Sequence, residues 1–439
     1  MKVESTRKAV AGGDWLGQVP ASWDVKPLFT VLDETDFRNS SMQERNLLSL
    51  SYGKVIRKDI DAVGGLLPES FETYQIVQAG DIVLRLTDLQ NDQRSLRVGL
   101  VPERGIITAA YVNLRARPKH DPRFLFYQLH NADVRKVFYN FGGGVRQSMK
   151  FGDLKRLPVV LPPHAEQRAV ADFLDRETVR IDELMCSKQS AIELLEAQKI
   201  AEIAGALSGG SSSTRQSGLG WCPEIPKQWP VAPLYARYSV QLGKMLDTAR
   251  ISGTDLRPYI RNQDVQWDWV NTENLPFMDF DSVDRVKFTL RSGDLLVCEG
   301  GDIGRTAVWR GDVQECYFQK ALHRLRPRSS EDCPRFLYYL MYLGSKAGAF
   351  LADSNPNTIP HLTAEKLRRQ RFPFPPRDEQ EAIVASLDRQ WRTIEQLRRR
   401  IGSGSTVLLE YRSSLISAAV TGQIDVRHYR PQEAATLCQ

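Results

Sequence analysis

Cysteine chemistry has little support in this chain of 439 residues. Its six cysteines are scattered, and none stands in a CxxC pair or beside a histidine at ligand spacing. We therefore expect neither a disulfide framework nor a zinc site. Long apolar runs are missing as well, both at the N-terminus, where a signal peptide would lie, and elsewhere, where a membrane span needs about 18 apolar residues. These absences predict a soluble cytoplasmic protein with no membrane segment.

Catalytic and cofactor motifs are also lacking. The nearest match to a GxxxxGK[ST] phosphate loop, at 300–306, has the wrong spacing and an arginine in place of the lysine. The turn of an amino-methyltransferase needs Asn or Asp, two prolines and an aromatic residue, and 355–358 lacks the second proline and the aromatic. The six histidines form no HExxH pair, and no serine stands in a GxSxG elbow. We expect a non-enzymatic chain without a metal or cofactor of its own.

What the chain does contain is a long internal repeat that occurs twice. The segment LPPHAEQRAVADFLDRETVRIDEL at 161–184 returns at 374–397 as FPPRDEQEAIVASLDRQWRTIEQL. The opening WLGQVPASWDVKPL at 15–28 likewise returns at 221–234 as WCPEIPKQWPVAPL. Shorter Gly-Asp, Leu-Arg and Pro-Arg-Phe-Leu motifs recur between them in the same order. The pattern indicates one unit of roughly 210 residues that occurs twice.

Each copy has the pattern of an α+β domain followed by a long helix. Short apolar runs of strand length, punctuated by glycine and proline, precede a helix that begins at Pro122 or Pro334. A Pro-Pro pair then leads into helix-spaced apolar residues. The predicted order is a globular domain at 1–165, a long helix at 166–207, a flexible linker at 208–220, a second globular domain at 221–375, a second long helix at 376–421, and a C-terminal tail at 422–439.

Apolar residues repeat at heptad spacing along both long helices, which predicts that each stripe packs against a partner helix. The stripes consist of Leu174, Ile181, Leu184 and Leu195 in the first helix, and of Leu387, Ile394, Leu397, Ile401, Leu408 and Leu415 in the second. The alternative is that each stripe packs on its own globular domain. Gly402 and Gly404 interrupt the second stripe, and each costs about 1 kcal/mol relative to alanine. We expect a local break or loosening there.

The net charge of +6 is modest, but its distribution is informative. The positive charge lies in the two globular segments, whereas the first long helix is acidic. A polyanion would therefore be met by the globular domains.

Two kinds of loop in each copy mix the side chains that read duplex DNA. Arginine, asparagine and glutamine suit base edges, and lysine and arginine suit phosphates. The loops just before the long helices supply Arg146, Gln147 and Lys150 in the first copy, and Asn357, Thr358 and His361 in the second. The turns and strands elsewhere supply Lys54, Arg94 and Arg97 in the first copy, and Arg261, Asn262, Gln263 and Arg305 in the second. These are the candidate DNA-binding residues.

The duplicated motifs resemble those of the DNA-specificity (S) subunit of type I restriction-modification systems. The similar features are the Trp-Leu-Gly-x-x-Pro-x-x-Trp opening at 15–23, the Pro-Pro-x-x-Glu-Gln helix entries at 162–167 and 375–380, and the ending LLEYRSSLISAAVTG at 408–422. The resemblance covers nearly the whole chain. It departs at Cys222 and Pro223, where the second opening lacks Leu-Gly, and over 197–210 at the end of the first helix.

The resemblance implies that each globular unit is a target-recognition domain that reads one half of a bipartite site in double-stranded DNA. The two helices would pack as an antiparallel coiled coil, forming a spacer that docks two methyltransferase (modification) subunits. Those subunits would carry S-adenosylmethionine and methylate adenine, while separate restriction subunits would use ATP and Mg²⁺ to translocate and cut DNA. Two alternatives remain: a specificity protein recruited to another defence complex or acting as an orphan DNA-binding adapter, and a coiled-coil scaffold with no DNA role.

Overall fold

The computed structural model describes residues 6–61, 68, 70–89, 92, 96–140, 148–208, 213–246, 253–351 and 361–426. The chain divides into two compact units, of which unit 1 comprises 1–188 and 402–439 and unit 2 comprises 189–401. Each unit therefore holds one globular domain and a portion of both long helices. In the described part of the chain, no helix is both long enough and apolar enough to cross a membrane.

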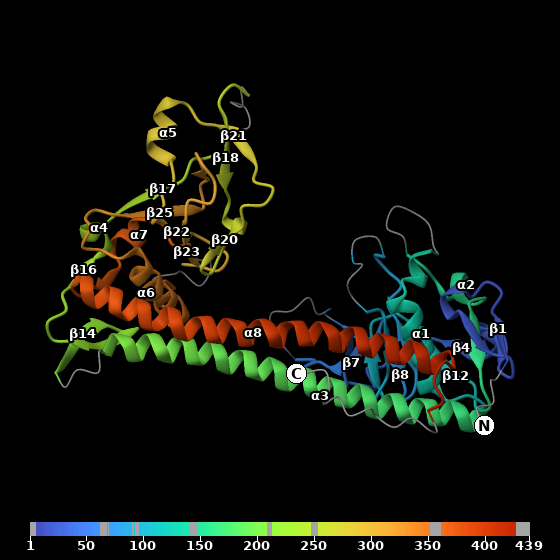
Figure 1. Cartoon of the computed structure of the whole chain (residues 1–439). Helices are drawn as coiled ribbons and strands as arrows, with labels where there is room; N and C mark the ends of the chain where they lie inside the picture. Colours follow the sequence, from blue (N-terminus) through green and yellow to red (C-terminus); the bar gives the residue numbers. More distant parts are fainter. Residues whose placement is uncertain are drawn as a thin grey trace. The chain divides into compact units, whose positions relative to one another are not determined.

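The two long helices extend over nearly the predicted ranges. They are α3 (His164–Ser208) and α8 (Arg377–Val420) (Figure 1). Both begin directly after a Pro-Pro pair, and in α3 the first turn is closed by the Pro163 carbonyl, which accepts from the amides of Glu166 and Gln167 at 2.8 and 3.0 Å. The pair ends the preceding strand because proline has no amide to donate to a sheet.

The predicted break at Gly402 and Gly404 is wrong, because α8 continues through both residues. A helix already formed on either side adds one hydrogen bond per residue, and the segment beyond the glycines is held by Leu415 in the core of unit 1. Gly404 also leaves room for a neighbour, since a Cβ at that position would lie 2.6 Å from Nζ of Lys188.

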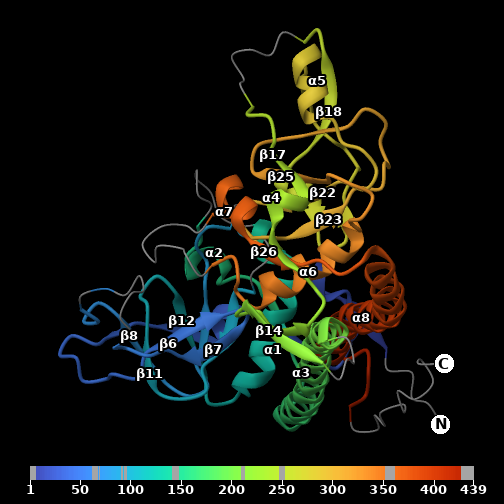
Figure 2. The ribbon, with the colours of Figure 1, turned by 90° about the vertical axis from the view of Figure 1, so that its left-hand side faces the viewer.

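Unit 1 is an α+β domain with a four-stranded antiparallel sheet in the order β10-β9-β12-β4 and a three-stranded sheet in the order β11-β8-β5. Helix α1 packs against β10 and β12. Figure 2 shows α1 at one side of the group of strands labelled β6, β7, β8, β11 and β12. The helices and main strands are α1 (Pro122–Val134), α2 (Phe151–Leu154), β1 (Arg7–Ala9), β2 (Gln18–Pro20), β3 (Asp24–Pro27), β4 (Leu32–Thr35), β5 (Phe37–Arg38), β6 (Leu48–Ser51), β7 (Lys54–Arg57), β8 (Gln75–Val77), β9 (Ile82–Leu84), β10 (Val98–Leu100), β11 (Gly105–Ile107), β12 (Val112–Ala116) and β13 (Pro158–Leu161).

Unit 2 has the same kind of fold, with a four-stranded antiparallel sheet in the order β17-β25-β22-β23 and a three-stranded sheet in the order β21-β18-β24. Read from its other edge, the four-stranded sheet of unit 1 gives the corresponding order β4-β12-β9-β10. The helices and strands are α4 (Leu234–Arg237), α5 (Ser282–Phe288), α6 (Pro334–Lys346), α7 (Ala364–Arg369), β14 (Thr214–Leu219), β15 (Cys222–Pro226), β16 (Val231–Pro233), β17 (Tyr238–Leu242), β18 (Leu256–Ile260), β19 (Val265–Gln266), β20 (Trp269–Val270), β21 (Phe277–Asp279), β22 (Leu295–Cys298), β23 (Thr306–Val308), β24 (Tyr317–Phe318), β25 (Leu322–Pro327) and β26 (Arg371–Pro373).

The predicted short helices begin at Pro122 and Pro334, as α1 and α6 do, and strands precede each of them. A second segment differs from prediction: the range 208–220, expected to be a flexible linker, contains β14, which pairs with β15. Small polar residues there favoured a linker, but a hairpin partner in the following segment satisfies the backbone of 214–219.

The recurring Gly-Asp and Leu-Arg motifs form the same ion pair in both units. Arg115 on β12 donates to Asp81 through Nε and Nη2, both at 2.7 Å, and Arg326 on β25 donates to Asp294 in the same way, again at 2.7 Å. Both carboxylates are almost fully buried. These motif residues therefore hold neighbouring strands together.

Candidate nucleic-acid interface

Each globular domain is fixed to its long helix by residues of the repeated motif. In unit 1, Arg123 at the start of α1 donates to Asp172 and Asp175 of α3 at 2.7 and 2.8 Å. In unit 2, Arg335 at the start of α6 donates to Asp388 of α8 at 2.9 and 2.8 Å. The domains are thus carried on the helices by charged hydrogen bonds.

The glutamine of the helix entry adds a second tie. Gln167 accepts from the amide of Asp121 at 3.0 Å and donates to the Pro162 carbonyl at 2.9 Å. Gln380 repeats this in unit 2, accepting from the amide of Cys333 and donating to the Pro375 carbonyl, both at 2.8 Å. The conserved spacing between the proline pair and the glutamine is explained by these bonds within each unit.

Unit 2 brings together candidate residues that are far apart in the sequence. The 3-10 turn Asn262–Asp264 follows Arg261, and Nη2 of Arg305 donates to both the backbone and side-chain oxygens of Asn262 at 3.1 Å. His361 lies beside the loop between β22 and β23 that carries Arg305, because a Cβ on Gly300 would be 3.2 Å from the Nδ1 of His361. We call Arg261, Asn262, Gln263, Arg305 and His361 the recognition cluster.

Hydrogen bonds within the recognition cluster separate the residues that hold it from those available to a ligand. Asn262 also donates its amide to the carbonyls of Gly300 and Ala321 at 3.3 and 3.1 Å, so its side chain is used to hold loops. The bond to Asp264 raises the pKa of Arg261, and Nε and Nη2 of Arg261 each donate to that carboxylate at 2.8 Å. Gln263 is exposed. Gln263 is therefore the planar side chain best placed to meet a base edge.

Two of the unit 1 candidates are exposed. Lys54 on β7 is exposed over 60% of its side chain and pairs with Asp182 of α3 at 2.6 Å. Lys150 is exposed and precedes α2. An exposed pair of this kind contributes little to stability, so Lys54 can exchange its carboxylate partner for a phosphate at small cost.

The prediction that Arg97 reads DNA is wrong for this structure. Arg97 is fully buried, and its guanidinium donates to the carbonyls of Thr87 and Asp88 at 2.8 and 3.1 Å and to the Tyr139 hydroxyl at 3.0 Å. A guanidinium with these partners holds the surrounding loop in place. The sequence could not reveal this, because an arginine next to a turn is usually solvated.

The remaining candidates fall outside the described residues. They are Arg94, Arg146 and Gln147 in the first copy, and Asn357 and Thr358 in the second.

The helix stripes divide into buried and exposed members. Leu174, Ile181, Leu387, Ile394 and Leu415 are buried within their own units. Leu195, Ile401 and Leu408 are half-buried. Leu184 and Leu397 are 45% and 43% exposed. Only these last two are open enough to meet another protein, and the buried leucines and isoleucines belong to the packing of each unit.

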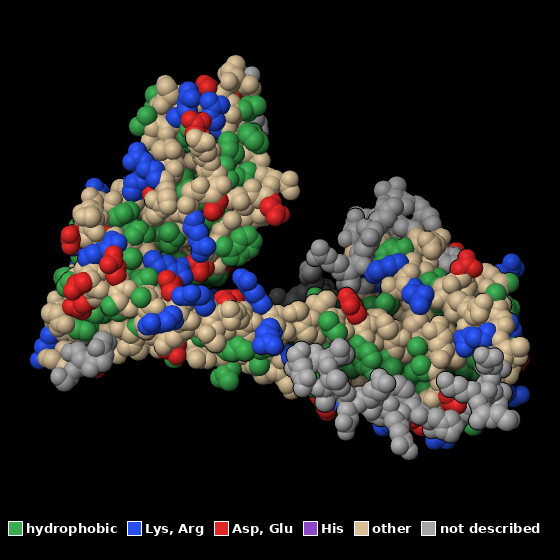
Figure 3. Space-filling model, viewed as in Figure 1, with side chains coloured by type: hydrophobic (Ala, Val, Ile, Leu, Met, Phe, Trp, Pro, Cys, Tyr) green, Lys and Arg blue, Asp and Glu red, His purple; other side chains and the backbone are tan. Residues whose placement is uncertain are grey.

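Cationic side chains gather on the part of α8 that lies in unit 2. Exposed arginines there are Arg389, Arg392, Arg398, Arg399 and Arg400. Figure 3 shows blue side chains along this helix and others on the globular domain above it. A surface of this kind attracts a polyanion at long range.

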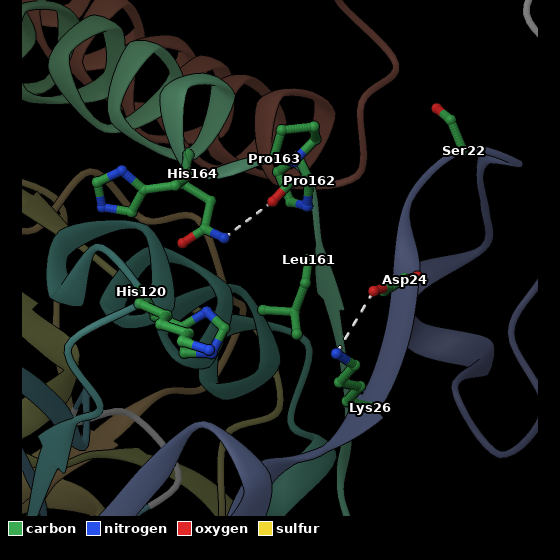
Figure 4. Close-up of a pocket in the computed structure, with 10 residues that line it drawn as sticks. Ser22, Asp24, Lys26, His120, Leu161, Pro162, Pro163 and His164 are labelled. Carbon is green, nitrogen blue, oxygen red and sulfur yellow. Dashed lines mark hydrogen bonds and ion pairs between the residues drawn. The ribbon is translucent and has the colours of Figure 1, made fainter.

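A cavity of about 280 Å³ lies at the start of α3 in unit 1. Figure 4 shows His120 and His164 on one side of it and Asp24 and Lys26 on the other. Burial and the nearby Lys26 lower the pKa of His120. Asp24 faces Lys26 at 3.4 Å. The Asp24 carboxylate therefore pairs with a lysine. In a site where a histidine acts as general base, the carboxylate would instead orient the imidazole.

Sequence reasoning missed a groove in unit 2, because its lining comes from five separate segments, one of which is Arg310 after β23. It is bordered by the β19–β20 hairpin, α6 and portions of α3 and α8. The aromatic residues of the helix Pro334–Lys346 were the one available signal, and they are equally typical of a core.

Comparison with known proteins gives concordant matches. A family model for the type I restriction modification DNA specificity domain matches residues 251–401. The specificity subunit of the type I restriction enzyme EcoBI from Escherichia coli is 25% identical over 131 residues, covering 30% of this chain and 27% of that protein. The putative type I restriction enzyme MjaX specificity subunit from Methanocaldococcus jannaschii is 23% identical over 443 residues, covering 94% of this chain and 96% of that protein.

Solved structures give a similar fold. A chain from a study of complex assembly and conformational transition of the type I R-M system matches with a TM-score of 0.64 and 18% identity, covering 92% of this chain and 99% of that chain. The HsdS subunit from Thermoanaerobacter tengcongensis, at 18% identity and 92% coverage of this chain (98% of that chain), reaches only 0.43.

Proposed function

We propose that this chain, which the comparisons identify as a DNA-specificity subunit of a type I restriction-modification system, reads a bipartite duplex site with one globular domain for each half. The recognition cluster of unit 2 supports this most directly. It joins an exposed glutamine to an arginine and a histidine on loops that the part-buried hydrogen bonds of Asn262 hold in place. Planar readers on a rigid support are what base recognition in a groove requires.

The second support is that both units build the same strand order and hold neighbouring strands together by the same ion pair. A common scaffold with different loops can present a different set of readers in each unit. Each domain would then recognise its own half-site, and phosphates would be held by lysines such as Lys54 and by the exposed arginines.

We further propose that α3 and α8 pair antiparallel as the spacer and carry the docking sites for two methyltransferase subunits. Within unit 1 the start of α3 and the end of α8 share one core, and Arg412 of α8 bonds to Asp182 of α3. Within unit 2, Lys199 of α3 bonds to Glu395 of α8 at 2.6 Å. The exposed Leu184 and Leu397 are the apolar residues that we assign to docking. Restriction subunits would join through the same complex.

The proposal is tested by sequencing the methylated sites of cells that contain this chain and its methyltransferase subunits. Gln263→Ala should relax one base position in one half-site and leave the other half unchanged, because a lost bidentate base contact costs about 1–3 kcal/mol. The matched control is Gln314→Ala, another exposed glutamine of unit 2. Equal relaxation of both half-sites would refute the assignment of one domain to one half.

A second arm uses the purified chain with labelled S-adenosylmethionine and DNA. We expect no methyl transfer until methyltransferase subunits are added, because the sequence offers no cofactor motif. Methylation by the chain alone would refute the proposal that this subunit is not itself a methyltransferase. Co-purification with a different defence complex, with the half-site pattern intact, would favour a recruited specificity protein.

A further inference from the structure

The groove in unit 2 has the size and lining of a small-molecule site. Its volume is about 550 Å³, within the range of ligand pockets, roughly 300–1,000 Å³. Residues from α3, α6, α8 and the β19–β20 hairpin line it, together with Arg310 after β23. All of these residues belong to unit 2, so the groove lies within one compact body.

Aromatic rings form much of its wall. Trp267 stands edge-on to Tyr342, with ring centroids 4.9 Å apart, and Trp391 stands edge-on to the same tyrosine at 4.9 Å. Trp269 at the rim is 54% exposed. An exposed indole with further aromatics behind it offers a planar ligand a face to stack on.

Two polar atoms of the lining are buried without a hydrogen-bond partner in the described part of the chain. They are the hydroxyl of Tyr338 and the indole nitrogen of Trp391. Tyr338 is fully buried and Trp391 is 5% exposed. An indole N–H can only donate, and leaving such a donor unpaired costs about 1–3 kcal/mol. A ligand rich in hydrogen-bond acceptors would satisfy both donors.

The rim is cationic. Nζ of Lys346 lies 5.5 Å from the ring centres of both Trp267 and Tyr342, and Arg310 stands 3.9 Å from Asp268. Arg398 and Arg399 also line the groove, whereas Glu395 is used by Lys199 at 2.6 Å and by Arg398 at 2.9 Å. Five cationic and three anionic side chains line the groove, so its lining carries a net positive charge, which favours an anion.

These features are absent from the first copy of the repeat. At the positions that correspond to Tyr338, Tyr342 and Trp391, unit 1 has Phe126, His130 and Thr178. The scaffold shared by both units does not require the groove residues. These residues therefore have a role that is specific to unit 2, whereas the recognition of half-sites is a role that both units share.

We propose that this groove binds a free purine nucleotide. The base would stack on Trp269 and Trp267, its ring acceptors would meet the unpartnered donors of Tyr338 and Trp391, and the phosphates would lie among Lys346 and Arg310. A planar, acceptor-rich anion matches the aromatic wall, the unpartnered donors and the cationic rim together. Each of these three features alone would fit a wider class of ligand.

The test is calorimetric titration of the full-length protein with ATP, AMP, adenosine and tripolyphosphate. We expect saturable binding of ATP that is tighter than that of adenosine or tripolyphosphate, because the base and the phosphates contact different walls. Tripolyphosphate binding as tight as ATP would mean a general anion surface. Lack of saturable ATP binding would refute the site.

The decisive variants remove one donor and keep the ring. Tyr338→Phe should weaken ATP binding by about 3- to 10-fold, the value of one hydrogen bond, while the melting temperature stays the same or rises, because a buried hydroxyl without a partner is lost. Lys346→Ala should weaken ATP binding about tenfold or more and leave adenosine unaffected. Tyr235→Phe, an exposed tyrosine outside the groove lining, is the matched control.

Nucleotide affinity unchanged in both Tyr338→Phe and Lys346→Ala would overturn the assignment even if the wild type binds ATP. None of these variants touches the recognition cluster, so DNA reading should be retained in each. Failure of the nucleotide site is therefore distinguishable from failure of the DNA-reading proposal.

Discussion

His130 should make unit 1 sensitive to mild acid. Its ring is buried in α1 at 7% exposure, lies 5.8 Å from the Phe126 ring, and has an Nδ1 without a partner among the described residues. Burial, and then the charge of Arg412, lower its pKa from 6.5 to about 4. In the unfolded chain His130 takes up a proton near pH 6.5, whereas in the folded unit it stays neutral down to about pH 4.

The sign of the effect follows from this difference. A histidine whose pKa is depressed on folding contributes its full stability above about pH 6.5 and loses it as the pH falls toward 4. For a shift of this size, the contribution of His130 to the free energy of unfolding should drop by roughly 2 kcal/mol between pH 7.5 and pH 5. His130→Leu removes the titrating group and should abolish that loss.

The assay is hydrogen exchange of the amides in Pro122–Val134, measured as protection factors at pH 7.5 and pH 5, which reports the opening of unit 1 separately from unit 2. The control is His164→Gln, an exposed histidine of the same unit. The difference in opening free energy between His130→Leu and wild type should grow by roughly 2 kcal/mol on acidification. A difference that does not change with pH would refute the reasoning.

Three further predictions follow from single contacts. Burial raises the pKa of Asp133 to about 6, so the folded unit loses stability as the pH rises from about 4 to 6 and this carboxyl group ionises. Asp133→Asn should therefore stabilise unit 1 at pH 7.5 but not at pH 4, as measured by protection factors. Arg335→Met should destabilise unit 2 by about 2–3 kcal/mol in urea unfolding, because Asp388 loses its charged donor; an unchanged midpoint would contradict this. Gly402→Ala should raise stability by up to about 1 kcal/mol, because space there is open, whereas Gly404→Ala should gain less because its Cβ meets Lys188; equal thermal shifts would contradict the difference.

The sequence determined the elements and their order. Strands and helices follow from local patterns of apolar residues, glycine and proline, and the two Pro-Pro pairs fix the starts of α3 and α8 to within a few residues. The repeat also determined which motifs recur, and through them the resemblance to a known family. These are properties of neighbouring residues, so a linear pattern is enough to find them.

The tertiary structure decided what each polar residue does. Arg97 and Gln263 both looked like DNA readers, yet Arg97 is buried among carbonyls and Gln263 is exposed. The continuity of α8 through Gly402 depends on packing beyond the glycines, which outweighs local helix propensity. The groove lined by Tyr338 and Trp391 exists only where segments far apart in the chain meet. Burial and partner choice arise from contacts across the fold, and no spacing rule along the chain specifies them.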